Sequence, residues 1–183
     1  MKIIKKDIWE LRQDNWWIIV PTNGAVKKDG SNAMGRGVAW QANKLFKGFA
    51  NAVGNLITKN GNNVYLFERQ KLITFPTKNN WKGESDLELI EKSCKQLKAF
   101  RTKLSLIDKF TMPKVGCGNG KLDWDKDVFP IINAYFGDLM DTEFMVVDNS
   151  QGDFQGWLGN NFWNQKKGKK DNVTFRDIDF GRN

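Results

Sequence analysis

The stretch MPKVGCGNGKLDW, from Met112 to Trp124, decides the fold of this 183-residue chain. An apolar run leads through Val115 to three glycines in five residues, at 116, 118 and 120, and a stretch with helical apolar spacing follows over 128–136. A strand, a glycine loop and a helix in this order leave backbone N–H groups free to hold an anion. The pattern therefore predicts a phosphate cradle or an ordinary tight turn, and its spacing matches neither the Walker A nor the dinucleotide fingerprint.

A second stretch, PTNGAVKKDGSNAMGRGVAWQANKLF from Pro21 to Phe46, has the same organisation. It follows an apolar run over residues 16–20 and begins with a polar, loop-like segment over 21–33. Gly35-Arg36-Gly37 then opens a predicted helix over roughly residues 37–57. Two glycine loops, each between a strand and a helix, can bracket one extended ligand with an anionic centre.

These motifs together resemble the macrodomain family, a fold that binds ADP-ribose. TNG followed by MGRGVA resembles the family's ribose-binding Asn and first glycine loop, and MPKVGCGNGKLDW resembles its diphosphate-binding loop. Lys6-Asp7-Ile8 resembles a Gly-Asp-Ile motif on the adenine side, with Lys in place of Gly. FPTKNNWKGES, over residues 75–85, resembles the branch that contains the terminal ADP-ribose protein glycohydrolase and the antitoxin that removes ADP-ribose from DNA. The resemblance covers roughly residues 1–150.

The resemblance implies a ligand site with two catalytic residues. Asp7 is the implied acceptor for the adenine amino group, and its alternative role is a cap at a strand end. Asn23 would orient the distal ribose, and its alternative role is a turn residue beside Gly24. Lys78, in a predicted loop, would assist departure of the C1″ group or attack C1″, and its alternative is a solvated surface lysine. The implied ligand-binding set is Asp7, Ile8, Asn23, Gly35, Gly37, Val38, Gly116, Cys117, Gly118, Asn119 and Gly120.

The second loop departs from the protein glycohydrolase, which carries an Asp after GCGL. The aligned position here is Gly120, and Asp123 lies three residues later. GCGNG matches the DNA-directed antitoxin-like subgroup better, which favours a nucleic-acid or small-nucleotide substrate, and the net charge of +8 is compatible with that. The sequence has no histidine, so imidazole chemistry is excluded, including the route of histidine-dependent ADP-ribose 1″-phosphate phosphatases.

Three functions remain open from the sequence. The first is a hydrolase that cleaves a C1″ linkage of ADP-ribose on DNA, on protein or in ADP-ribose 1″-phosphate. The second is a module that binds ADP-ribose without turnover. The third is a basic nucleic-acid-binding domain whose loops do not hold ADP-ribose. None of these three functions requires a metal or a cofactor.

Alternating strands and helices predict an α/β/α sandwich with a mixed central sheet, in agreement with the macrodomain fold. Predicted strands cover residues 2–4, 16–20, 64–67, 71–75, 104–112 and 144–147, and Pro76 is expected to end the fourth. A Ser85–Glu88 capping box should start one helix. Another helix should start near Asp127, with Pro130 in its first turn.

Residues 1–150 are predicted to form one macrodomain, and residues 151–183 a C-terminal extension that is not a separate domain. The two cysteines, Cys94 and Cys117, form no disulfide framework and indicate a reducing, cytoplasmic setting. The start MKIIKKDIWE is too charged for a signal peptide, and no segment approaches membrane-spanning length, so no membrane partner is expected. Truncation after Asn149 is expected to leave a cooperatively folding domain.

Overall fold

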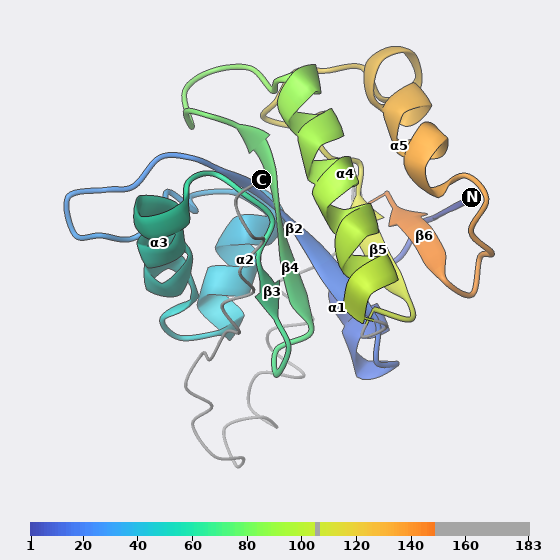
Figure 1. Cartoon of the computed structure of the whole chain (residues 1–183), viewed down its shortest axis with the longest axis horizontal. Coiled ribbons are helices and arrows are strands. Elements are labelled where there is room, and N and C mark those ends of the chain that lie inside the picture. The colour runs from blue at the N-terminus through green and yellow to red at the C-terminus, as the bar shows by residue number, and fades with distance from the viewer. Residues whose placement is uncertain (105–106, 149–183) are drawn as a thin grey trace.

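One six-stranded sheet organises the computed structural model, which describes residues 1–104 and 107–148 (Figure 1). The strand order is β1-β6-β5-β2-β4-β3, and every neighbouring pair is parallel except the antiparallel pair β3–β4. The predicted C-terminal extension lies outside the described residues. The strands are β1 (Lys2–Ile4), β2 (Trp17–Asn23), β3 (Leu66–Phe67), β4 (Leu72–Lys78), β5 (Phe110–Pro113) and β6 (Phe144–Val147).

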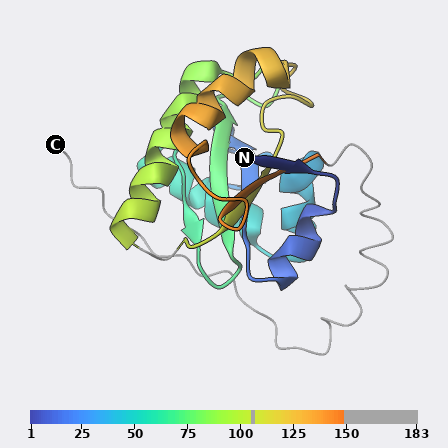
Figure 2. The same ribbon diagram turned by 90° about the vertical axis from the view of Figure 1, so that its right-hand side faces the viewer.

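Helices cover both faces of the sheet, so the predicted α/β/α sandwich with a mixed sheet is confirmed (Figures 1 and 2). One face carries α1 (Ile8–Gln13), α2 (Gly37–Leu45) and α3 (Phe49–Asn60), and the other carries α4 (Leu87–Leu104) and α5 (Phe129–Phe136). A single π-helical turn, Trp124–Val128, leads directly into α5. Within the described residues, no helix combines the length and the apolar character needed to cross a membrane.

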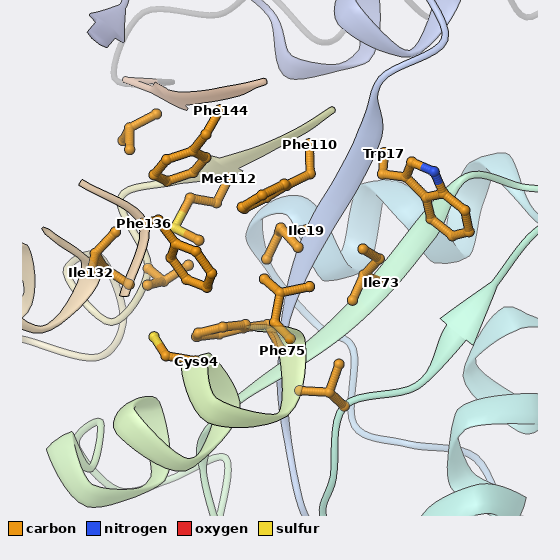
Figure 3. Close-up of a cluster of buried hydrophobic side chains, with 14 of the residues drawn as sticks. Trp17, Ile19, Ile73, Phe75, Cys94, Phe110, Met112, Ile132, Phe136 and Phe144 are labelled. Carbon is orange, nitrogen blue, oxygen red and sulfur yellow. The ribbon is translucent and has the colours of Figure 1, made fainter. Parts of the chain in front are cut away.

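The core consists of two apolar clusters, one on each side of the sheet. Strand β2 supplies both, because successive strand residues point to opposite faces: Trp17 and Ile19 face α4 and α5, whereas Ile18 and Val20 face the other helices. This explains why its sequence is a continuous apolar run. Figure 3 shows the aromatic centre of the first cluster, where the rings of Phe110 and Phe144 stack with centroids 4.6 Å apart.

Two predicted elements are wrong in their extent. The helix expected over residues 37–57 is interrupted, because Gly48 adopts a left-handed φ of 86° and separates α2 from α3. The strand expected over residues 104–112 is confined to β5, because α4 continues to Leu104. The positive charges of Arg101 and Lys103 in the last turn of α4 stabilise the helix there, because they interact favourably with the negative end of its dipole.

Strands β2 and β4 both run further than predicted, to Asn23 and Lys78. The expectation that Pro76 ends β4 is wrong. A register shift between Thr22 and Asn23 accommodates the proline on the β2 side, and β3 is too short to pair with it on the other side. The extension moves Lys78 from the predicted loop into the end of a strand.

Helix starts also differ from the prediction. Asp86, not Ser85, caps α4, because its Oδ1 accepts from the backbone N–H groups of Glu88 and Leu89 at 3.0 and 3.2 Å. The helix expected from Asp127 is preceded by the π-helical turn, whose N-cap Asp123 accepts from the Lys126 N–H at 2.9 Å. Pro130 lies in the first turn of α5, as predicted.

Candidate functional site

The two glycine loops meet at the carboxyl ends of β2 and β5, which are neighbours in the sheet. The chain after β2 leads to α2 on one face, and the chain after β5 leads to α5 on the other (Figure 1). Adjacent parallel strands whose connections leave to opposite faces mark the usual ligand position in open α/β sheets. Tertiary structure therefore places both predicted loops at the position where this sheet would bind a ligand.

Asn119 is the point at which three segments converge. Its side-chain Oδ1 accepts from Nη1 of Arg36 at 3.3 Å, and its backbone oxygen accepts from Nζ of Lys78 at 2.5 Å. Arg36 belongs to the first loop, Asn119 to the second, and Lys78 ends β4. The predicted proximity of the two loops is thus visible as a direct hydrogen bond.

The three glycines of the second loop have different structural roles. A Cβ on Gly120 would lie 2.1 Å from both the Gly116 backbone oxygen and the Ser85 Oγ, so position 120 has no room for a side chain. Gly116 adopts a left-handed φ of 78°, and its oxygen accepts from the Leu122 N–H at 3.2 Å. A Cβ on Gly118 would meet no heavy atom of the described residues within 4 Å. Gly118 is therefore the glycine of this loop that faces open space.

In the first loop, Gly35 and Gly37 face open space, and the side-chain amides of Asn23 and Asn32 hold the loop in place. Within the part of the chain that the structure describes, added Cβ atoms on Gly35 and Gly37 would meet nothing within 4 Å, although Gly37 has a left-handed φ of 57°. Gly37 begins α2, and the N-cap residue Arg36 makes no side-chain capping bond. The first backbone N–H groups of α2 are therefore not capped by Arg36, which suits an anion. Val38, the next residue, is only 8% exposed and packs in the core, so its side chain offers a ligand little surface.

Asn23 has the turn role that was its alternative in the sequence. Its Nδ2 donates to the Ala33 oxygen at 2.8 Å, and its Oδ1 accepts from the Ala25 N–H at 2.9 Å. The backbone oxygens of Asn23 and Ala25 accept in turn from Nδ2 of Asn32. An amide retains one more donor and one more acceptor position, so the predicted ribose contact stays a prediction.

Lys78 is buried, with 9% of its surface exposed, and the prediction of a loop lysine is wrong. Its ammonium donates to the backbone oxygens of Gly83 and Asn119, at 2.7 and 2.5 Å. Burial lowers the pKa of this lysine, the nearby positive charge of Lys121 lowers it further, and Glu84 opposes the shift. An ammonium has three donors, so one N–H remains after these two bonds.

Cys117 is a half-buried thiol in the second loop whose Sγ donates to the Val115 oxygen at 3.2 Å. Burial raises the pKa of Cys117 to about 11, and the carboxylates at 123, 125 and 127 act in the same direction. The thiol therefore stays protonated at neutral pH and is a poor nucleophile. Among the described residues, no three His, Cys, Asp or Glu side chains gather as they would around a metal ion.

Asp7 caps α1, accepting from the Trp9 N–H at 2.9 Å, and Ile8 is fully buried. Asp7 therefore caps a helix and not a strand end, and its adenine role stays a prediction. Asp7 follows β1 at one side of the sheet, whereas Lys78 ends β4 beyond β6, β5 and β2. The predicted adenine and ribose residues therefore lie on opposite sides of the second glycine loop.

No protein-family model and no curated protein sequence matches the chain. Several solved structures match it. The macrodomain of Mycobacterium tuberculosis DarG is 25% identical, with a TM-score of 0.68 over 81% of this chain and 97% of that one. The Thermus aquaticus DarG macrodomain (22% identity, TM-score 0.62, 81% and 97% covered) shares the fold. Thermosipho africanus DarTG in complex with ADP-ribose also shares the fold, with 19% identity and a TM-score of 0.68 over 85% of this chain and 43% of that one.

The chain is a macrodomain that resembles those of DarG. The family suggested by four short motifs is therefore confirmed by the fold. The described part of the macrodomain, up to Asp148, spans all six strands and both glycine loops.

Three residues of this macrodomain site escaped the sequence reasoning. Arg36 had no predicted role beyond its place in Gly35-Arg36-Gly37 at a helix start, yet it bridges the two loops. Asn32 is 1% exposed and holds the first loop through two backbone oxygens. Ser85 was interpreted as a helix cap, but its N–H donates to the Gly120 oxygen at 2.9 Å. The available signal was a nearby glycine: Arg36 lies between Gly35 and Gly37, and Asn32 and Ser85 each lie two positions after a glycine.

Proposed function

We propose that this macrodomain binds ADP-ribose and hydrolyses the bond between C1″ of the distal ribose and an attached group. The observation that carries the proposal is the placement of the Lys78 ammonium, buried beside Asn119 of the second glycine loop. The likeness to DarG macrodomains supports it, as does the Thermosipho africanus DarTG structure, which contains ADP-ribose.

The diphosphate would lie between the two loops. Gly118 on one side and Gly35 and Gly37 on the other leave space against the backbone. The N-terminus of α2 contributes a partial positive charge, and Arg36 supplies a full one at the loop junction. Together these groups suit two negative charges, the charge of a diphosphate.

Lys78 would act on the leaving group. Water adds to C1″ and loses one proton to solvent, the bond from C1″ to the attached group breaks, and the attached group leaves with the electron pair and gains a proton, which its donor regains from solvent. The remaining N–H of the ammonium can supply that proton or stabilise the developing negative charge. Burial lowers the pKa of Lys78, which makes the ammonium a better acid than an exposed lysine. Asn23 would hold the ribose hydroxyls beside it.

The structure supports a substrate other than a protein glutamate ester. The protein glycohydrolase relies on an Asp at the position of Gly120, and here that position is filled by the Gly116 oxygen and Ser85 Oγ. The nearby Asp123 is used as the N-cap of the π-helical turn. ADP-ribosylated nucleic acid, or a small nucleotide such as ADP-ribose 1″-phosphate, is therefore the preferred substrate class, in keeping with the net charge of +8.

The test is single-turnover release of ADP-ribose from ADP-ribosylated DNA, ADP-ribosylated protein and ADP-ribose 1″-phosphate, at saturating enzyme. Lys78→Ala should lower the release rate about a hundredfold or more, the usual scale for a positioned acid or electrostatic group. Lys95→Ala, which removes a 63% exposed lysine side chain on α4, is the matched control and should change the rate little. Equal rates for Lys78→Ala and wild type would remove Lys78 from the mechanism.

A module that binds without turnover is the second candidate, and one observation favours it. Lys78 already donates to two backbone oxygens, and the Asn23 amide is bonded through both its oxygen and its nitrogen, so both side chains have structural roles. Calorimetric binding of ADP-ribose, combined with no release from any of the three substrates, would select this candidate. Absence of ADP-ribose binding would select the third one, a basic nucleic-acid-binding domain.

A further inference from the structure

The connection between α3 and β3 reaches the strand end that carries Lys78. It begins at Gly61, whose positive φ of 87° ends α3, and continues through Asn62 and Asn63. Neither asparagine belongs to a glycine loop, and the mechanism proposed above uses neither. Asn62 nevertheless contacts Lys78 directly, through the lysine backbone.

The backbone oxygen of Lys78 accepts two hydrogen bonds from two different segments. Nδ2 of Asn62 donates to it at 2.9 Å, and the N–H of Gly24 donates to it at 3.0 Å. The orientation of the Asn62 amide is determined by this contact, because an amide oxygen in place of Nδ2 would be repelled. Lys78 is thus held at two points: by these donors at its backbone, and by two other backbone oxygens at its ammonium.

Gly24 shows how closely the segments approach each other here. A Cβ at this position would lie 3.0 Å from Nδ2 of Asn62 and 3.0 Å from the backbone oxygen of Asn79, which is tighter than ordinary van der Waals contact. The register of the β2–β4 pair shifts at the same place and sets Asn23 opposite Lys78. Asn62 therefore lies at the junction that places the two predicted catalytic residues relative to each other.

The Asn62 amide makes this contact while its own oxygen stays unsatisfied. Its Oδ1 is buried and has no hydrogen-bond partner among the described residues. A buried acceptor without a partner destabilises a fold, and the Lys78 oxygen would keep its bond to Gly24 if the amide were absent. Stability alone therefore gives little reason for an asparagine at position 62, whereas a fixed position of Lys78 gives one.

The next residue, Asn63, has contacts of a different kind. Its Nδ2 donates to the Asn60 oxygen at 2.7 Å, and its Oδ1 accepts from Nε2 of Gln96 at 3.0 Å. These two bonds join the turn to the end of α3 and to α4, and neither reaches Lys78. Asn63 therefore stabilises the turn itself, which makes it a matched control for its neighbour.

We infer that Asn62 is a positioning residue for Lys78: by holding the lysine backbone oxygen, it keeps the ammonium beside Asn119, where release of the C1″ group requires it. Asn62 acts through Lys78 and not on the ligand. The inference rests on the proposed function, and it adds to the mechanism a residue that lies outside both glycine loops.

The first test measures single-turnover release, ADP-ribose affinity and melting temperature in the full chain. Asn62→Ala should lower the release rate about tenfold or more, because a small displacement of a catalytic group is enough for such a loss. Its ADP-ribose affinity and melting temperature should stay close to those of wild type. Asn63→Ala should show the reverse, a lower melting temperature with an unchanged rate.

Asn62→Asp is a second variant that keeps the size of the side chain. It sets a carboxylate oxygen against the Lys78 oxygen, so it should lower the release rate at least as much as Asn62→Ala. An unchanged rate in either Asn62 variant overturns the inference. So does a rate loss in Asn62→Ala that Asn63→Ala matches, because the effect would then be one of turn stability.

A second test reports the position of the lysine without any turnover. Acetylation of Lys78 by acetic anhydride, followed by mass spectrometry, should be about threefold to tenfold faster in Asn62→Ala than in wild type, the effect of one lost hydrogen bond on local opening. It should be no faster in Asn63→Ala. Equal acetylation of Lys78 in Asn62→Ala and wild type overturns the inference. Faster acetylation in Asn62→Ala, together with no release by wild type from any substrate, would support the hold of Asn62 on Lys78 and indicate failure of the proposed function instead.

Discussion

The two glycine loops have the same pattern in sequence and are built differently. The second loop is closed by its own backbone and by Ser85, so its Gly120 is enclosed and only Gly118 faces open space. The first loop is held by the amides of Asn23 and Asn32, and both Gly35 and Gly37 face open space. One loop is shaped by close packing and the other by side-chain hydrogen bonds.

This difference shows that a glycine in a ligand-binding loop has one of two roles: it allows the loop to pack closely, or it leaves space for the ligand. Where an added Cβ would strike the protein, as at Gly120, the glycine maintains the loop, and replacing it should affect stability first. Where an added Cβ would enter empty space, as at Gly118, the glycine leaves room for a ligand, and replacing it should affect binding first. Matched substitutions at these two positions test that division directly.

Gly118→Val should have the largest effect, a loss of ADP-ribose affinity of at least a hundredfold. The branched side chain would occupy space that the ligand needs, while the backbone is not in the left-handed region that only glycine favours. Isothermal calorimetry measures the affinity, and thermal unfolding should show a melting temperature close to that of wild type. A folded Gly118→Val protein that binds as tightly as wild type would show that the two loops do not form a cradle.

Alkylation of Cys117 should be about a hundredfold slower at pH 8 than that of a thiol with an ordinary pKa. Raising the pKa from 9.0 to about 11 lowers the thiolate fraction by that factor, and the thiolate is the reactive form. The rate should therefore rise about tenfold per pH unit up to roughly pH 10. Mass spectrometry with iodoacetamide follows the reaction, with Cys117→Ser to subtract labelling of the buried Cys94. Fast labelling at pH 7 would show that the second loop does not shield the Cys117 thiol from water.

Gly120→Ala should destabilise the fold by about 1–3 kcal/mol, the usual cost of overpacking. The new methyl group would meet the Gly116 oxygen and Ser85 Oγ, and the backbone oxygen cannot swing away as a flexible side-chain end can. For a chain of this size the melting temperature should fall by roughly 2–10 °C. Gly120→Ala combined with Ser85→Ala should recover only part of the loss. An unchanged melting temperature for Gly120→Ala would mean that the second loop is as loosely built as the first.

Arg36→Gln should have the smallest effect, a loss of ADP-ribose affinity of about twofold to fivefold, in line with an exposed charge contact. Arg36 joins the loops at 3.3 Å and lies beside the expected diphosphate. The effect should shrink as salt is raised, because exposed charges are screened. Lys44→Gln, in the last turn of α2, removes the same charge away from the loops and should leave the affinity unchanged. If both variants lose affinity equally, net charge and not the loop bridge is responsible.

Several features of the site were predictable because they depend on local chemistry. Glycine spacing located both loops, the apolar run before the first loop located the start of β2, and a separate apolar run located β6. Helix lengths were harder, because the break between α2 and α3 depends on a single residue, Gly48, in a left-handed conformation. The reach of β4 past Pro76 was missed because a proline normally ends a strand unless a partner strand shifts register to meet it.

Residue types in a recognisable order were enough to suggest the macrodomain fold, to locate the two loops and to single out Lys78 as a candidate. Tertiary contacts were needed to show that Lys78 is buried at a strand end, that Gly120 has no room for a side chain and that Asn32 Oδ1 has no hydrogen-bond partner among the described residues. The physical reason is that burial, close approach and hydrogen-bond satisfaction depend on neighbours from distant segments. Lys78 is paired with an oxygen 41 residues away, and Arg36 with one 83 residues away.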